Sequence, residues 1–142
     1  MDDTAAPTAA SAPAPADLLA AMPFAVAQGF TLSGAAPDRV VGHVDWAPER
    51  CTAGGVLHGG VLMALADSVG AVCAFLNLPP GAGTSTIESK TNLFRAVREG
   101  SVTATARPVH VGRSTIGVQT EVRDDRERLV ALTFQTQAVL TA

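Results

Sequence analysis

The chain has 142 residues, of which 47% are hydrophobic and 16% charged, and its formal net charge is −3. This length suits one globular domain, and the lack of a basic surplus argues against nucleic acid as a partner. The long apolar run over residues 59–76 is interrupted by Asp67 and Gly70 and falls short of the roughly 20 residues that a membrane span needs. We therefore expect a cytoplasmic protein with no membrane and no nucleic-acid partner.

The N-terminal part of the sequence predicts a leader followed by a domain. Residues 1–16 are mostly Ala, Pro, Ser and Thr, a composition typical of disorder, so one domain is expected over residues 17–142. Asp17 is placed to cap a short helix that breaks near Pro23. Residues 28–46 predict a hairpin that turns at Pro37-Asp38. One face of its second arm is formed by Val40, Gly42, Val44 and Trp46.

The rest of the sequence predicts one helix followed by sheet. Residues 60–76 have helical length and apolar residues on every face, which predicts a helix that is buried nearly all round and is terminated by Pro79-Pro80-Gly81. Segments rich in Val, Thr, Ile and Phe then predict four strands, at residues 85–95, 102–111, 115–123 and 129–140. Because their connections are short, consecutive strands are expected to be antiparallel neighbours. The economical fold is α+β, with an antiparallel β-sheet wrapped around a long central helix.

Asp67 is the only charged side chain between Arg50 and Glu88. An ionised carboxylate among residues that normally fill a core is costly unless it is paired. This carboxyl group must therefore be neutral, paired across an interface, or facing a cavity where it does chemistry. The position is the strongest candidate for a catalytic residue.

Gly59 and Gly60, at the predicted start of the helix, form a second candidate feature. The first N–H groups of a helix have no internal partners, and glycine lets a ligand approach them, so they can bind an anion or a developing oxyanion. The simpler alternative is that the glycines only permit a tight turn. Gly59 and Asp67 are about 12 Å apart along a helix axis, so one reacting carbonyl cannot touch both within one chain. If both act on it, a second copy supplies one of them, and the protein is an obligate dimer.

Histidine and cysteine give weaker signals. His58 is a candidate catalytic residue, although a lone His beside a helix start more often has a structural hydrogen bond, and we favour that role. Cys51 and Cys73 indicate reduced structural thiols. No Cys/His spacing resembles a metal site and no phosphate-binding glycine loop is present, so no metal and no cofactor are expected.

The segment Leu57–Asp67, in which His58-Gly59-Gly60 precedes Asp67 at this spacing, resembles the signature of the hotdog-fold acyl-CoA thioesterases. The similarity is greatest to the branch that contains the phenylacetic-acid-degradation and the Glu-dependent 4-hydroxybenzoyl-CoA thioesterases, and it continues through residues 93–100 and 111–114. The resemblance implies a hotdog fold, a homodimer or homotetramer, and hydrolysis of an aryl- or medium-chain acyl-CoA.

The same resemblance implies roles for particular residues. Gly59 would polarise the thioester carbonyl through its N–H group, and Asp67 of the partner subunit would be the nucleophile or the general base. Five further residues match substrate-binding positions, the last three of them as contacts to the CoA phosphates: Gly60, Thr52, Arg95, Arg113 and Ser114. A solvated position at a strand end is an equal alternative for each of those three.

Three positions depart from the family pattern. Thr52 stands where the Glu-type enzymes have Gln, Ala71 where they have Thr, and Ala96 where Pro is usual, which leaves the acyl group and the activation of water open. Two other functions remain as alternatives. A non-catalytic acyl-CoA-binding or sensor protein needs no carboxylate on the helix, and a hotdog dehydratase needs a catalytic His paired with an acid. The presence of Asp67 favours the thioesterase.

Overall fold

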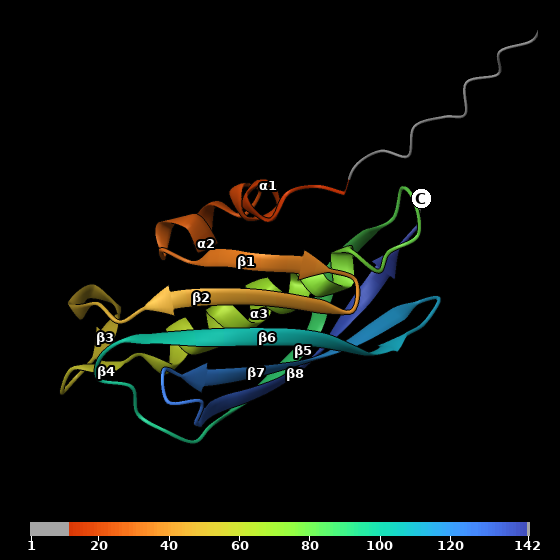
Figure 1. Ribbon diagram of the computed structural model, residues 1–142. Coiled ribbons are helices and arrows are strands. Elements are labelled where there is room, and N and C mark those ends of the chain that lie inside the picture. Colours follow the sequence, from red (N-terminus) through yellow and green to blue (C-terminus); the bar gives the residue numbers. More distant parts are fainter. Residues whose placement is uncertain (1–11, 142) are drawn as a thin grey trace, which may run out of the picture.

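The computed structural model describes residues 12–141, which form a sheet curved around one long helix (Figure 1). The helix is α3 (Gly59–Phe75), and the sheet is antiparallel with six strands, so the predicted α+β class is confirmed. Its strands are β1 (Thr31–Ala36), β2 (Arg39–Asp45), β5 (Gly83–Leu93), β6 (Ser101–Val111), β7 (Thr115–Asp124) and β8 (Leu129–Leu140). A short 3-10 helix (Pro48–Arg50) and a two-stranded ribbon of β3 (Cys51–Thr52) and β4 (Val56–Leu57) lead into α3.

Two short helices, α1 (Pro15–Ala20) and α2 (Pro23–Ala27), precede the sheet. Residues 1–11 of the predicted leader lie outside the described residues, and α1 begins two residues before the predicted domain boundary. The prediction that Asp17 caps this helix is wrong. Ala14 is the N-cap residue, and Pro15 starts the helix because the fixed φ of proline suits the first helical position.

The strands lie in the order β1-β2-β6-β7-β8-β5. The predicted hairpin is confirmed, since β1 and β2 pair antiparallel on either side of Pro37-Asp38. The expectation that the strands at 85–95 and 102–111 are neighbours is wrong. Both sides of β6 are already paired, with β2 and β7, so the chain crosses from β5 at the sheet edge to β6 through residues 94–100.

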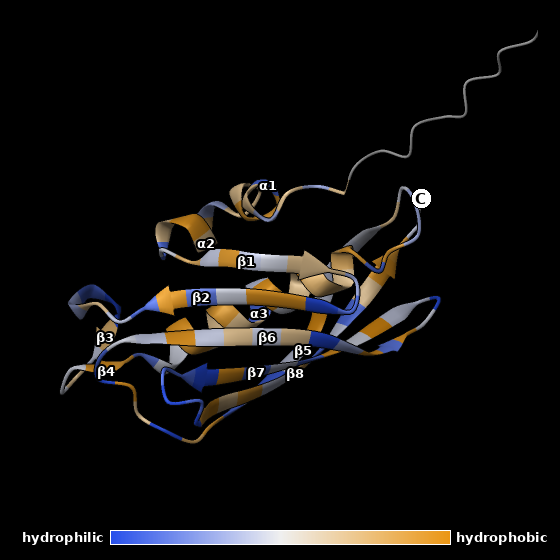
Figure 2. Ribbon diagram, in the orientation of Figure 1, coloured by the Kyte–Doolittle hydropathy of each residue, from blue (hydrophilic) through white to orange (hydrophobic). Residues whose placement is uncertain are grey.

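Most of the surface of α3 is buried against the sheet, and the helix is hydrophobic along its length (Figure 2). The prediction that it is buried nearly all round is nevertheless wrong for one stripe. Along this stripe Gly60, Met63 and Phe75 are exposed and Asp67 is half-buried, because no helix or strand within residues 12–141 covers that side.

The predicted extent of the helix, residues 60–76, is confirmed to within one residue at each end. Its last residue is Phe75, and the side chain of Asn77 donates hydrogen bonds to the carbonyl groups of Cys73 and Pro37, at 2.8 and 2.7 Å. The carbonyl of Cys73 in the last turn is thus satisfied by a side chain beyond the end of the helix.

A β-bulge in β8 decides which of its side chains face the helix. Val122 of β7 pairs with Ala131, but the next residue of β7 pairs with Leu129, so Val130 is the extra residue. After the bulge, Thr133, Gln135 and Gln137 are buried, while Phe134 is 46% exposed. A row of polar side chains therefore lies beneath the helix.

Candidate active site

Asp67 lies on the uncovered stripe of α3, between the helix and the edge strand β5. Its Oδ1 atom accepts hydrogen bonds from Thr86 Oγ1 of β5, at 3.3 Å, and from Gln135 Nε2 of β8, at 3.2 Å. Both donors are neutral, and within residues 12–141 no cation forms an ion pair with Asp67. A half-buried carboxylate that is held by neutral donors is suited to act as a nucleophile or as a base.

The first turn of α3 leaves one backbone N–H group open. His58 is the N-cap residue, and its Nδ1 atom accepts a hydrogen bond from the Gly60 N–H at 2.7 Å. The carbonyl of His58 accepts from the N–H groups of Val61 and Leu62, at 2.9 and 3.3 Å. The Gly59 N–H has no acceptor in the part of the chain that the structure describes. It lies at the positive end of the helix dipole, so it is placed to bind a developing oxyanion.

The backbone that presents Gly59 is tied to two neighbouring segments. The His58 N–H donates to the carbonyl of Arg50 at 2.9 Å, and the Leu57 N–H donates to the carbonyl of Val97 at 2.8 Å. A Cβ atom at position 59 would lie 2.7 Å from Leu93 Cδ1, the end of a half-exposed side chain that can move aside. The open N–H of Gly59 is therefore held in a fixed position at the N-terminus of α3.

The two central groups of the predicted site do not meet within one chain. Gly59 and Asp67 both belong to α3, and their positions on the helix are about 12 Å apart along its axis. The Gly60 N–H is already bonded to His58, so it is not available as a second donor. A reaction in which both groups act on the same carbonyl must therefore combine two copies of the chain.

The predicted substrate contacts also fall into two separate groups. Thr52 is exposed in β3, and Arg95 is exposed in the segment that follows β5, so both lie at the Gly59 end of α3 (Figure 1). Arg113 and Ser114 are exposed in the turn between β6 and β7, at the other end of β6. Since β6 has 11 residues, the groups are roughly 33 Å apart. One chain does not bring them to the same nucleotide.

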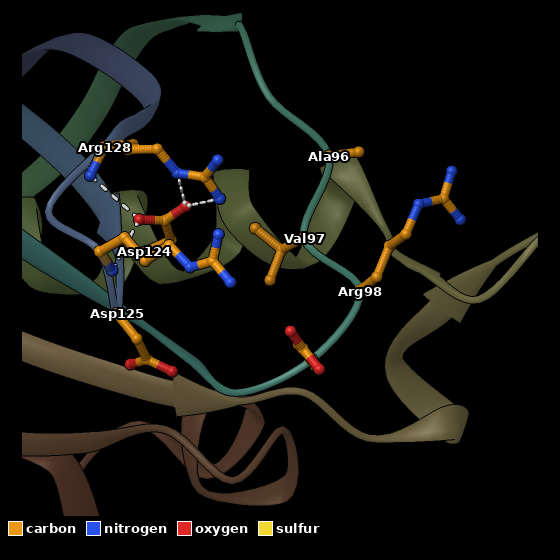
Figure 3. Close-up of a pocket in the computed structure, with 8 residues that line it drawn as sticks. Ala96, Val97, Arg98, Asp124, Asp125 and Arg128 are labelled. Atoms are coloured by element: carbon orange, nitrogen blue, oxygen red, sulfur yellow. Dashed lines mark hydrogen bonds and ion pairs between the residues drawn. The ribbon is translucent and has the colours of Figure 1, made fainter.

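A polar cavity of about 240 Å³ lies between residues 96–99 and the turn after β7 (Figure 3). Burial acts to raise the pKa of Asp124, but the hydrogen bonds and charge of Arg128, with the Arg126 N–H, outweigh it and hold that pKa below its ordinary value. Hydrogen bonds from the hydroxyl and the N–H of Ser101 lower the pKa of Asp125. Asp124 is paired with Arg128, Asp125 is held by Ser101, and the lining includes no predicted site residue, so we assign the cavity a structural role in the turn.

An apolar cavity of about 210 Å³ adjoins Asp67 along the helix. Ala71 lines it and follows Asp67 by one helical turn, on the same face. Thr84 lines it too, and the next inward residue of the same strand is Thr86, which contacts Asp67. The full lining is Leu18, Ala21, Met22, Ala71, Val72, Phe75 and Thr84. An apolar group attached to a carbonyl at Asp67 is within reach of this space.

Two residues of the site, Thr86 and Gln135, are absent from the sequence-based candidates. Both contact the carboxylate of Asp67, yet they belong to strands far away in the chain and match no motif. The sequence gives only a weak signal for these two residues. It consists of polar residues at every second position of a strand, as in Thr133, Gln135 and Gln137, where a core-facing strand normally has apolar ones.

Among residues 12–141, no group of three His, Cys, Asp or Glu side chains is placed to hold a metal ion. Over the same range, none of the helices has the length and apolar character to cross a membrane.

Comparison with known proteins places this geometry in context. A family model described as Thioesterase superfamily matches residues 54–131, which is more than half of the chain. A Vibrio cholerae protein named “Putative esterase” is 41% identical over 85 residues, covering 60% of this chain and 57% of that protein. The 1,4-dihydroxy-2-naphthoyl-CoA hydrolase of Escherichia coli is 34% identical over 86 residues, covering 61% of this chain and 63% of the hydrolase. The chain thus spans about three fifths of the length of these curated relatives.

Solved structures resemble this chain over a larger share of its length than the curated relatives do. The crystal structure of a thioesterase from Haemophilus influenzae has a TM-score of 0.87 to this chain at 26% identity. The superposition covers 92% of this chain and 93% of the other. The hotdog form of the α+β fold is therefore confirmed.

Proposed function

Since the chain belongs to the thioesterase superfamily, we propose that it hydrolyses acyl-CoA thioesters to a free acid and CoA. Asp67 is the nucleophile or the general base, and the Gly59 N–H polarises the thioester carbonyl. The observation that carries this proposal is the first turn of α3, where the Gly59 N–H alone is left without an acceptor within residues 12–141. A single open N–H at a helix start, on the same helix as a carboxylate without a cation, fits a site for acyl transfer.

The proposed site is shared between two copies of the chain. The support is the 12 Å separation of Gly59 and Asp67, estimated at about 1.5 Å per residue, together with the uncovered side of the molecule. On that side Met63 is 43% exposed and Phe75 48%. Two α3 helices that lie antiparallel would cover these side chains and place Asp67 of each copy near Gly59 of the other. Two such dimers would form a homotetramer.

Two chemical routes fit these residues. In the first, Asp67 takes a proton from water while the water oxygen adds to the carbonyl carbon. In the second, a carboxylate oxygen adds instead, the C–S bond breaks to give a mixed anhydride, and water then hydrolyses that anhydride. In both routes the negative charge that forms on the carbonyl oxygen is accepted by the Gly59 N–H, and CoA leaves as a thiolate.

The apolar cavity beside Ala71 supports an aryl- or medium-chain acyl group as the substrate class. Its volume of about 210 Å³ and its nearly apolar lining suit a ring or a short alkyl chain. The relative named as a naphthoyl-CoA hydrolase also supports an aromatic acyl group. Membership of the phenylacetic-acid-degradation or 4-hydroxybenzoyl-CoA branch stays a prediction, as does a cytoplasmic location.

CoA binding is proposed for the exposed arginines. Arg95, and Arg113 with Ser114, offer charge-assisted contacts to the nucleotide phosphates. Because Arg95 and Arg113 lie near opposite ends of β6 in one copy, a nucleotide that touches both must lie between two copies. Thr52, at the Gly59 end, is the proposed contact near the thioester, and Gly60 contributes space rather than its N–H.

The structure weighs against the dehydratase alternative. A dehydratase needs His58 as a base, and one ring nitrogen of His58 is bonded to the Gly60 N–H. The non-catalytic binding protein remains a distinct outcome of the test. In that case the protein binds acyl-CoA without releasing CoA.

A hydrolysis screen tests the proposal. The purified protein is incubated with short, medium-chain and aromatic acyl-CoA esters, and the free thiol is measured. We expect CoA release with the wild type, and Asp67→Asn is expected to lower kcat by roughly 10²–10⁴ without weakening acyl-CoA binding. Binding without release by the wild type would favour the sensor, and full turnover by Asp67→Asn would exclude Asp67 as the catalytic carboxylate.

A further inference from the structure

Two neutral side chains from different strands hold the same oxygen of the Asp67 carboxylate. Gln135 of β8 donates from Nε2 to Oδ1 at 3.2 Å, and the Thr86 hydroxyl of β5 donates to the same atom at 3.3 Å. The Gln135 amide also reaches the backbone carbonyl of Asp67, at 3.4 Å. No donor from residues 12–141 bonds Oδ2. The two oxygens of the carboxylate therefore have different surroundings.

The arrangement around Gln135 lowers the stability of the fold. The side chain is fully buried, and within residues 12–141 its Oε1 atom has no hydrogen-bond partner. A glycine in the interior of α3, Gly70, makes room for this amide, because a Cβ atom at position 70 would lie 2.6 Å from Gln135 Cδ. A buried polar atom without a partner and a glycine in mid-helix are both destabilising. Both are explained if the amide is needed at Asp67.

The direction of the Thr86 hydroxyl is also fixed. Gln137 Nε2 donates to Thr86 Oγ1 at 2.8 Å. The single proton of the Thr84 hydroxyl is shared between the Ala138 carbonyl, at 2.9 Å, and Gln137 Oε1, at 3.2 Å. Since Thr86 Oγ1 already accepts a hydrogen bond from Gln137, its own proton is left to point at Asp67 Oδ1. A second buried glutamine thus orients the second donor.

We infer that Gln135 and Thr86 are positioning residues for Asp67, which fix Oδ1 and leave Oδ2 as the oxygen that reacts. The inference rests on the proposed role of Asp67 and adds to it the atom that attacks the carbonyl or takes the proton from water. A carboxylate held at one oxygen by two donors from two strands cannot rotate freely. Its free oxygen therefore keeps one direction, and such orientation is a major source of rate.

Conservative variants test the two donors. Gln135→Met removes the amide at similar side-chain length, and Thr86→Val removes the hydroxyl at the same shape. Each is expected to lower kcat about 10- to 100-fold and to leave KM within about twofold, because the lost bond acts on the reacting group and not on substrate binding. Thr86→Ser, which keeps a hydroxyl, is expected to restore most of kcat.

Thr133→Val is the matched control. Thr133 is as buried as Gln135 and faces the same side of β8, but its hydroxyl is bonded to that of Thr91, at 2.7 Å. Removing it disturbs the same polar row without touching Asp67. We expect wild-type kcat from this variant, and a loss as large as that of Gln135→Met would overturn the inference.

The Asp67→Asn background separates positioning from structure. Gln135→Met and Thr86→Val are expected to add no further loss of kcat there, because no carboxylate remains to be held. Equal fractional losses in both backgrounds would overturn the inference and leave the role of Asp67 intact. Full activity of Asp67→Asn alone would contradict the proposed function, and the inference would fall with it. Thr86 lies on the exposed edge strand, so its Val and Ser variants decide the matter even if Gln135→Met does not fold.

Discussion

The Nδ1 atom of His58 accepts a hydrogen bond of 2.7 Å from the N–H of Gly60, so this histidine is bound to the helix that it precedes. The side chain and the carbonyl of His58 together occupy three of the first four N–H groups of α3. Among residues 12–141, the Gly59 N–H is the one group of these four without a hydrogen-bond acceptor. The proposed polarisation of the thioester thus depends on one backbone donor, which can be removed without changing another side chain.

Gly59→Pro is expected to remove most of the turnover and to leave α3 intact. Helices tolerate proline best at their first position, and His58 has the extended backbone, φ −62° and ψ 134°, that a residue before proline prefers. Loss of one oxyanion donor is expected to lower kcat by roughly 10²–10³. Gly59→Ala is the control, since it places a Cβ beside Leu93 but keeps the N–H. Equal kcat for the two variants would show that the N–H does not act in the reaction.

His58→Asn is expected to keep both stability and most of the activity, while His58→Ala loses the cap. Asparagine is among the strongest N-cap residues, and alanine at such a position costs about 1 kcal/mol of unfolding free energy. Urea denaturation of the two variants measures this difference. If His58 were itself catalytic, both variants would lose kcat alike.

The residues that carry an unusual local signal are the ones that the sequence predicts best. Asp67 stands out because no other charge occurs in its segment, and Gly59 stands out because a glycine pair opens a helix. The α+β architecture follows from periodicities of two and of three to four residues, which are local properties. These features need no knowledge of which strands pair.

The features that the sequence did not reveal depend on contacts between distant segments. The placement of β5 beside β8 is decided by competition for the edges of β6, and the inward direction of Gln135 follows from a bulge at Val130. Gly70 resembles an ordinary helix defect until Gln135 is seen against it. The uncovered stripe with Met63 is likewise invisible, because every residue of the helix except Asp67 and Ser68 is apolar or glycine.

Arg95→Ala and Arg113→Ala are each expected to raise KM for CoA thioesters about 10-fold or more, since a charge-assisted contact to phosphate contributes roughly 1.5–3 kcal/mol. Turnover of a small thioester that lacks the nucleotide is the control and should change little. Steady-state kinetics with both substrates measure the effect. Comparable losses on the two substrates would assign the arginines a structural role.

Cys73 is expected to resist alkylation in the folded protein, while the partly buried Cys51 reacts. Burial, together with the negative charge of Asp38, raises the pKa of Cys73 from its ordinary 9.0 to about 11. Because the thiolate is the reactive form, Cys73 stays protonated and inert at neutral pH.

The contribution of the protonated Cys73 thiol to the free energy of unfolding is complete below about pH 9 and is lost as the pH rises toward 11. Mass spectrometry after iodoacetamide treatment should find Cys51 modified and Cys73 unmodified until the protein is unfolded; early modification of Cys73 would contradict its burial.

The claim that one site combines Gly59 of one copy with Asp67 of another is tested most directly by pairing two inactive variants. Asp67→Asn and Gly59→Pro subunits are co-expressed with different affinity tags, and the mixed dimer is purified through both tags. In a shared site, this dimer has one site with both groups intact and one site with neither. The account predicts that the mixed dimer regains thioester hydrolysis from that one intact site while both parent homodimers stay inactive. A mixed dimer as inactive as its parents would contradict the shared site.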